Sequence, residues 1–187
     1  FIFALFFIML LLGNLAKAVD VNSYSSLNKE LEKSGSATVN VTEKILIKGV
    51  IHVRGTKTLN GMNNNLNRDA TTGKQYYGVL FQVGKAGAYT GHLTVKNAVI
   101  SGNGQEASMS AGADGRLIRV VEPGSSLVLT DGAVLKNNFN SDRIMDGGGG
   151  VTVLNGCTAE MRGSSQIISN RSKTGGAAIR VEAGGSF

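Results

Sequence analysis

The stretch IISNRSKTGGAAIRV, residues 167–181, places a polar, glycine-rich segment between two short runs of apolar residues. In the run Ile179-Arg180-Val181, apolar and polar residues alternate with a period of two. Such alternation is typical of a short strand that buries one face. The same step from an apolar run through a polar segment to a second run recurs along the chain, so the sequence predicts a repeat protein.

The apolar triplets fall into three columns. The first column begins at Ile45, Phe81, Ile118, Val151 and Ile179; the second at Ile51, Leu93, Leu127 and Ala159; and the third at Leu59, Ile100, Leu135 and Ile168. Three strands in each repeat of 28–37 residues predict a coil whose equivalent strands stack in parallel. We therefore predict an all-β fold, a right-handed parallel β-helix solenoid over residues 38–187 that is incomplete at its C-terminal end. An antiparallel sandwich is the alternative, but it gives no reason for every third strand to resemble its predecessor.

A short capping helix is predicted in the region of residues 19–37. Ser23 is suited to the N-cap and Gly35 to the C-terminal stop. Tyr24, Leu27 and Leu31 lie on one face of a helix. We expect this face to lie across the open N-terminal end of the coil.

Asparagines are expected at a bend after the third column. Asn137 and Asn170 occupy equivalent places there, and Gly61 and Gly102 take the place in the earlier repeats. Asparagine tolerates the left-handed backbone that a bend needs, and stacked asparagines also form amide ladders. The turn-forming role is the prediction, with a partial ladder as the alternative.

The chain opens on FIFALFFIMLLLGNLAKA, residues 1–18, which has the apolar run and the small-x-small end of a secretory signal peptide. The run is shorter than the roughly 20 apolar residues of a membrane span. We predict a signal peptide truncated at its start and cleaved after Ala18; an uncleaved N-terminal anchor is the alternative. The net charge of +6 includes no basic run of five or more residues, so no nucleic-acid partner is expected.

Cys157 is the one cysteine of the chain. A single cysteine excludes an internal disulfide framework, although exported proteins often use one. We predict that Cys157 is a small buried residue in a turn between strands.

Long insertions fall on one edge of the predicted coil, between the third column and the next first column. They are the segments 61–80, 102–116, 137–150 and 170–177. Insertions confined to one face of a solenoid often mark its binding face. Neutral drift at a tolerant position is the alternative explanation.

The charged residues of these segments are candidates for a catalytic or metal site. They are Asp69, Glu106, Asp114, Asp142 and Asp146, with Arg68, Arg116, Arg143 and Lys173. A calcium-dependent lyase needs several convergent carboxylates and a basic residue that takes a proton from the sugar. Only one group of three, Asp142, Arg143 and Asp146, lies close together in one loop, so we interpret the set as scattered, solvated loop charges.

No catalytic residue, metal ligand or cofactor is predicted, and the ligand-binding residues stay unknown. His52 points outward between Ile51 and Val53, and His92 has no aspartate or cysteine near it in sequence. Tyr76 and Tyr77 form the one pair of aromatic residues that looks exposed enough for stacking on a sugar, and strand initiation is the alternative explanation for the pair.

The segments ILIKGVIHVRGTKTLNG (45–61), LTVKNAVISGN (93–103) and IISNRSKTGGAAI (167–179) resemble the repeats of pectate-lyase-like right-handed β-helix surface proteins. Adhesin-like repeat proteins are among these, and polymorphic outer-membrane proteins are similar more loosely. The resemblance covers about residues 38–187 and implies export, display at the cell surface and attachment.

The resemblance and the gathering of insertions on one edge of the coil together predict a secreted or cell-surface, adhesin-like protein that is not an enzyme. Its expected partner is a glycan or a cell-surface protein. Membrane contact is expected only through the signal peptide or through an anchor after Phe187. The alternative is a polysaccharide lyase or glycoside hydrolase that acts on acidic polysaccharide.

Overall fold

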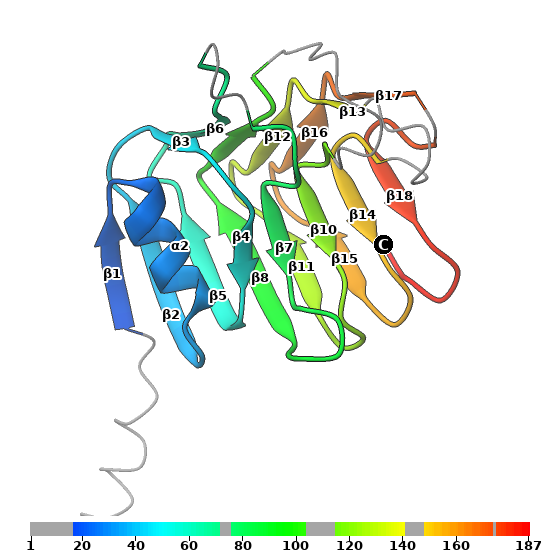
Figure 1. Cartoon of the computed structure of the whole chain (residues 1–187), viewed down its shortest axis with the longest axis horizontal. Coiled ribbons are helices and arrows are strands. Elements are labelled where there is room, and N and C mark those ends of the chain that lie inside the picture. The colour runs from blue at the N-terminus through cyan, green and yellow to red at the C-terminus, as the bar shows by residue number, and fades with distance from the viewer. Residues whose placement is uncertain (1–16, 72–75, 104–114, 141–147, 174) are drawn as a thin grey trace, which may run out of the picture.

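Parallel sheets around a common core make up the described part of the protein, which has one short helix at its N-terminal end (Figure 1). The computed structural model describes residues 17–71, 76–103, 115–140, 148–173 and 175–187. Sheet A consists of β1 (Lys17–Val21), β2 (Ser36–Val41), β5 (Gly55–Asn60), β8 (Gly91–Lys96), β11 (Ser126–Leu129) and β15 (Thr158–Met161). Sheet B consists of β3 (Ile45–Ile47), β6 (Asn65–Arg68), β9 (Val99–Ser101), β12 (Val134–Lys136) and β16 (Gln166–Ile168). Sheet C consists of β4 (Ile51–Val53), β7 (Phe81–Val83), β10 (Ile118–Val120), β14 (Val151–Val153) and β18 (Ile179–Val181). A separate pair joins β13 (Phe139–Asn140) to β17 (Arg171–Ser172).

The chain passes through sheets A, B and C in turn, and we call each passage a winding. The five windings run from β2 to β4, β5 to β7, β8 to β10, β11 to β14 and β15 to β18. Every strand of a winding pairs in parallel with the equivalent strand of the next. In sheet C, for example, Phe81 lies in register between Ile51 and Ile118. The prediction of an all-β fold with parallel strands is therefore confirmed.

The predicted columns are correct for the later windings and wrong for the first ones. Ile45 pairs with Leu66 in sheet B, whereas Ile51 pairs with Phe81 in sheet C. Leu59 belongs to sheet A, where it lies between Val39 and Val95. Short apolar triplets look alike in all three sheets, and β2 had not been recognised as a strand of sheet A. The first triplets were consequently assigned to the wrong sheets.

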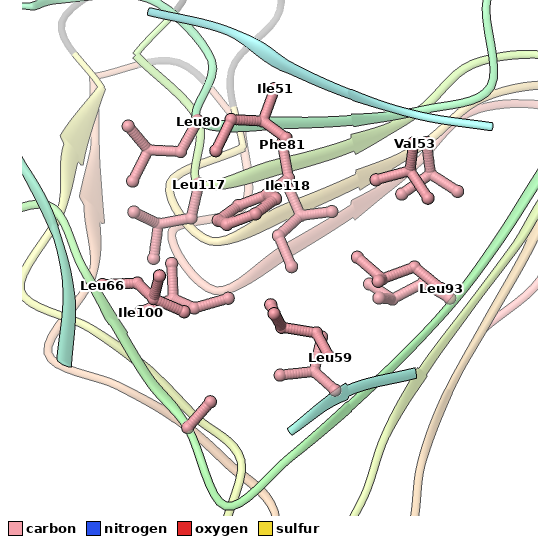
Figure 2. Packing of buried hydrophobic residues seen from close by; sticks show 14 of the residues in the cluster. Ile51, Val53, Leu59, Leu66, Leu80, Phe81, Leu93, Ile100, Leu117 and Ile118 are labelled. Atoms are coloured by element: carbon pink, nitrogen blue, oxygen red, sulfur yellow. The ribbon is translucent and has the colours of Figure 1, made fainter. Parts of the chain in front are cut away.

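Buried side chains from all three sheets meet in one core. Figure 2 shows Phe81 and Ile118 of sheet C directed toward the same interior as Leu93 of sheet A and Ile100 of sheet B. All four are at most 1% exposed. The alternation that gives each strand one apolar face thus explains why the strands close around a shared interior.

Helix α2 (Tyr24–Glu32) confirms the predicted helix at the N-terminal end. The Ser23 hydroxyl accepts a hydrogen bond from the Ser26 amide at 3.2 Å, as expected of an N-cap. Leu27 and Leu31 are fully buried in the core, and Tyr24 packs against it. Beyond the helix, Gly35 has the positive φ of 83° that favours glycine.

Strand β1 precedes this helix and covers the outer edge of β2. Lys17 and Ala18 pair with Ala37 and Thr38. Cleavage after Ala18 would shorten β1 to the three residues from Val19 to Val21. Residues 1–16, which hold most of the predicted signal peptide, lie outside the described residues. Within the described ranges, no helix combines the length and apolar character that crossing a membrane requires.

Lys57 occupies an inward position of β5, in register between Ala37 and Leu93. Its side chain is 1% exposed, and Nζ donates a hydrogen bond to the Gly35 carbonyl at 2.6 Å. Burial lowers the pKa of Lys57 below its ordinary value of 10.5, and Lys33 lowers it further, whereas Glu30 opposes the shift. A buried ammonium is therefore a cost to the folded state.

Raising the pH from 8 toward 10.5 should stabilise the natural chain relative to the Lys57→Met variant. Below the folded-state pKa the amine is charged in both states and the cost is complete. As the pH rises through the folded-state pKa, the folded chain loses the proton first and the cost falls. Urea unfolding of both chains across this range measures the difference, and Lys96→Met, at an outward position, is the control. A free energy of unfolding of the natural chain that, relative to the Lys57→Met variant, stays constant or falls as the pH rises would contradict the burial of Nζ.

Cys157 lies in the turn between β14 and β15 and is 1% exposed, which confirms the predicted buried cysteine. Its Sγ donates a hydrogen bond to the Glu122 carbonyl at 3.1 Å. Burial, and secondarily the charge of Glu122, raise the pKa of the thiol. Thiolate, the reactive form, is therefore scarce as well as inaccessible.

Ellman's reagent at pH 8 should modify native Cys157 at least about a hundredfold more slowly than it modifies the chain unfolded in guanidinium. The absorbance of the released thiolate measures both rates. Equal rates would show that the turn between β14 and β15 is open. A Thr158→Cys, Cys157→Ala chain gives the matched exposed thiol, because Thr158 is exposed in the neighbouring position.

Candidate functional site

The long connections of the chain lie on one edge of the molecule, between sheets B and C. After the first winding, sheet B is followed by the segments 69–80, 102–117, 137–150 and 169–178 before the chain enters sheet C. The connections on the other two edges are shorter, as between β8 and β9 or between β14 and β15. We call this side the loop edge. Its position agrees with the one-sided insertions predicted from the sequence, except that the first predicted insertion, 61–80, contains β6 of sheet B, so only 69–80 belongs to this edge.

Arg68 ties three windings together at the base of the loop edge. It ends β6, is 4% exposed, and donates to the carbonyls of Tyr76 and Gly78 in its own winding. In the next winding it reaches the Gly115 carbonyl at 2.8 Å and that of Arg116 at 3.4 Å. In the winding after that, it reaches Oδ1 of Asn138 at 3.2 Å. The planar guanidinium carries five donors, which suits such a convergence of carbonyl oxygens.

Asn138 continues this network along the stack. Its side-chain amide donates to the Gly115 carbonyl at 2.7 Å and to the Gly149 carbonyl. Its backbone amide donates to Oδ1 of Asn170 at 3.1 Å, and Nδ2 of Asn170 donates to the Leu135 carbonyl at 3.1 Å. Asn138 is 3% exposed. Hydrogen bonds therefore link the loop edge from the second winding to the fifth.

The predicted equivalence of Asn137 and Asn170 is wrong by one residue. Leu135 pairs with Ile167 rather than with Ile168, which brings Asn138 level with Asn170. Asn137 has a φ of 51° and is the turn former, whereas Asn138 and Asn170 make the hydrogen bonds between windings. Gly61 is not at this bend either, because a Cβ added to it would meet Ala98 between sheets A and B.

Three of the loop charges for which the sequence predicts solvated positions are buried. Asp69 is 2% exposed, Arg116 is 2% exposed, and Arg68 belongs to the network above. Oδ1 of Asp69 accepts hydrogen bonds from the Thr71 amide at 2.9 Å and from its hydroxyl at 2.6 Å. The sequence shows no sign of this burial, because Arg68 and Asp69 lie next to polar residues. Arg68 and Asp69 are buried because β6 ends at Arg68 and the chain passes between windings there.

An aromatic and basic patch lies further out on the loop edge. In the pair β13–β17, shown beside β16 in Figure 1, Phe139 is in register with Arg171. The Arg171 guanidinium lies 5.3 Å from the centre of the Phe139 ring, and the Lys173 ammonium lies 5.9 Å from it. Arg171 and Lys173 are exposed, and Phe139 is half-buried. Both cations are within the range of cation–π attraction.

Tyr76 is not the exposed stacking platform that the sequence suggested. It packs against the hydrophobic core, its hydroxyl donates to the Val79 carbonyl at 2.7 Å, and the Arg68 guanidinium lies 5.9 Å from its ring centre. Tyr77 is half-buried. Tyr76 therefore supports the Arg68 network more than it offers a surface to sugar.

Five of the nine loop charges considered from the sequence cannot be placed. Glu106, Asp114, Asp142, Arg143 and Asp146 lie outside the described residues. Among the residues that the structure does describe, no group of three or more His, Cys, Asp or Glu side chains is arranged to hold a metal ion. His52 and His92 take outward positions in sheets C and A, and Nδ1 of His92 lies 2.9 Å from the Ser126 hydroxyl.

A second polar ladder was missed by the sequence reasoning. On the outer face of sheet A, Nδ2 of Asn60 donates to Oδ1 of Asn40 at 3.1 Å, and Nδ2 of Asn40 donates to Asp20 at 3.0 Å. The three residues are in register across β1, β2 and β5. Their constant spacing of 20 residues in the sequence was the signal that could have revealed the short first winding.

The described part of the loop edge can therefore hold backbone in place and present charge, with the buried Arg68 guanidinium hydrogen-bonded to carbonyl oxygens. Hydrogen bonds between buried polar groups, such as those of Arg68 and Asn138, add rigidity to the base of the loop edge. No protein-family model, no curated protein and no solved structure matches the chain.

Proposed function

We propose that this chain is a secreted or cell-surface, adhesin-like protein built as a right-handed parallel β-helix of the pectate-lyase-like kind. In this proposal the loop edge binds a glycan or a cell-surface protein. The parallel pairing of every winding with the next supports the architecture. The resemblance of the repeats supports export and display.

The observation that carries the binding role is the buried network under the loop edge. Long loops cost conformational entropy when they order on a partner. Arg68 and Asn138 fix the backbone at Gly78, Gly115 and Gly149, where the long connections leave or rejoin the stack. Fixed loop ends reduce the part of each loop that has to be ordered on binding, which favours affinity.

A loop-replacement experiment tests the role of this edge. Residues 104–114 and 141–147 are replaced by glycine–serine segments of equal length, and binding to cell surfaces and to a glycan array is compared with that of the natural chain. We expect the replacement to abolish binding. The matched control replaces residues 85–88, an exposed connection between sheets C and A, and should bind normally. Loss of binding only in the control would refute the assignment to the loop edge.

The lyase or hydrolase alternative has a separate test. The complete protein is incubated with Ca²⁺ and polygalacturonate or a mixed glycan panel while unsaturated products and reducing ends are followed. We expect no turnover. If turnover appears and replacement of Asp142 and Asp146 by alanine abolishes it, the adhesin proposal gives way to a lyase. If the same variant still binds glycans or cells, Asp142 and Asp146 do not form a lyase site.

A further inference from the structure

The outer face of sheet A is a grid of mainly hydroxyl and amide side chains. Inward residues such as Val39, Leu59 and Val95 are fully buried, and the residues that alternate with them point outward. The outward residues are half-buried or exposed, so solvent reaches this face. They are Ser36, Thr38 and Asn40 of β2, Thr56, Thr58 and Asn60 of β5, His92, Thr94 and Lys96 of β8, and Ser126 and Val128 of β11.

Parallel pairing in register places these side chains in straight rows across the strands, of which β2, β5 and β8 lie side by side in Figure 1. Thr58 is in register with Thr38 on one side and with Thr94 on the other. The row beside it, which begins with Ser36 and Thr56, is aligned in the same way. Residues within a row are about 4.8 Å apart, and rows are about 6.6 Å apart along the strands. The face is therefore periodic in two directions.

The side chains of this grid have little freedom. Threonine is β-branched, which restricts its first side-chain torsion. In the asparagine row, Nδ2 of Asn60 donates to Oδ1 of Asn40 at 3.1 Å. In the outermost row, Nδ1 of His92 lies 2.9 Å from the Ser126 hydroxyl. A face that is already ordered loses little side-chain entropy when it binds a partner.

Charged side chains lie at the border of the grid. Asp20 and Lys96 are the two ends of the asparagine row, and Glu160 follows Val128 in the threonine row. The centre, around Thr58, is uncharged, so it offers no opposite charge to an ionic partner. The residues of the grid also include no phenylalanine, tyrosine or tryptophan ring on which a sugar could stack.

We propose that the outer face of sheet A binds ice. An uncharged grid with two fixed repeats matches a partner that is itself an uncharged lattice, whereas a flexible soluble partner needs no such periodicity. Water oxygens on a prism face of ice repeat in two perpendicular directions, at distances close to those within and between the rows of the grid. Each threonine offers a hydroxyl that hydrogen-bonds water and a methyl group that does not, so water held between the rows is ordered by both. This face is separate from the loop edge, and its function does not depend on a partner there.

Incorporation into slowly growing ice tests the proposal on the full chain. Ice is grown on a cold surface from a stirred protein solution, and the protein concentration in the ice is compared with that in the remaining liquid. We expect the natural chain to enter the ice. Thr58→Tyr places a ring at the centre of the grid and points it toward solvent, so the fold is kept but the face cannot approach the lattice. We expect this variant to enter ice at least about tenfold less than the natural chain.

Gln82→Tyr is the matched control, because Gln82 is half-buried on the outer face of sheet C. It should enter ice as the natural chain does. Urea unfolding verifies that each variant is folded, and Thr94→Tyr is the second variant of the grid in case Thr58→Tyr is not. The chain with replaced loops 104–114 and 141–147 should also enter ice, which separates this test from that of the loop edge.

Two results would overturn the proposal directly: exclusion of the natural chain from ice, or an equal loss in Gln82→Tyr and Thr58→Tyr. Binding to crystalline cellulose or chitin is measured in parallel. If the natural chain binds either solid, stays out of ice and loses this binding in Thr58→Tyr, the grid recognises a polysaccharide instead.

Discussion

Replacing Arg68 by methionine lowers the free energy of unfolding by about 3–5 kcal/mol. The guanidinium donates to oxygens of Gly78, Gly115 and Asn138, which belong to three windings. Methionine fills most of the volume but donates nothing, so buried carbonyl oxygens lose their partners. Urea unfolding followed by far-UV circular dichroism measures the change.

Arg54→Met is the matched control for this substitution. Arg54 is exposed, and its guanidinium lies 5.1 Å from the centre of the Tyr89 ring. We expect this variant to lose less than about 1 kcal/mol. Equal losses in the two variants would mean that burial of Arg68 in the hydrogen-bonded network is not what stabilises the fold.

Replacing Phe81 by alanine should cost about 3–5 kcal/mol of unfolding free energy. Phe81 is fully buried and lies in register between Ile51 and Ile118, so its ring bridges the second winding to its neighbours on both sides. Removing the ring leaves a cavity. The backbone of β7 cannot move to fill it, because β7 is hydrogen-bonded to β4 on one side and to β10 on the other. Chemical denaturation of the variant measures the loss.

Gln82→Ala provides the control at the adjacent position. Gln82 is half-buried on the outer face of β7, and its substitution should change stability by less than about 1 kcal/mol. If the two alanine variants were equally destabilised, the inward and outward faces of β7 would have been assigned wrongly.

The sequence was sufficient for the strand type and for the helix, because each depends on local pattern. Alternating triplets such as Ile118-Arg119-Val120 form strands with one buried face, and Ser23 begins the helix. The assignment of the first triplets to sheets failed for a different reason. The spacing from Val39 to Leu59 is shorter than that of the later windings, and triplets of the three sheets are chemically alike. Which strands are neighbours is a property of the tertiary structure, and the alternation within a triplet of three residues does not determine it.

The candidate site was less predictable than the fold. The sequence located the edge where insertions gather, because loop length can be read directly. It gave no sign that Arg68 and Asp69 turn inward, since burial of a charge depends on partners supplied by distant windings. A register error of one residue similarly hid the contact between Asn138 and Asn170. Polar networks between windings can therefore be predicted only once the register between the paired strands is known.

A pair of spin labels on the outer face of sheet A tests the stacking of windings most directly. In a Cys157→Ala background, labels at Thr38 of β2 and Glu160 of β15 are separated by four strand spacings, or about 19 Å at roughly 4.8 Å each. Labels at Thr58 and Glu160 are separated by one spacing less. Pulsed electron paramagnetic resonance should give a distance near 20 Å for the first pair and about 5 Å less for the second. A first distance above about 30 Å, or one no longer than the second, would contradict the stack of parallel windings.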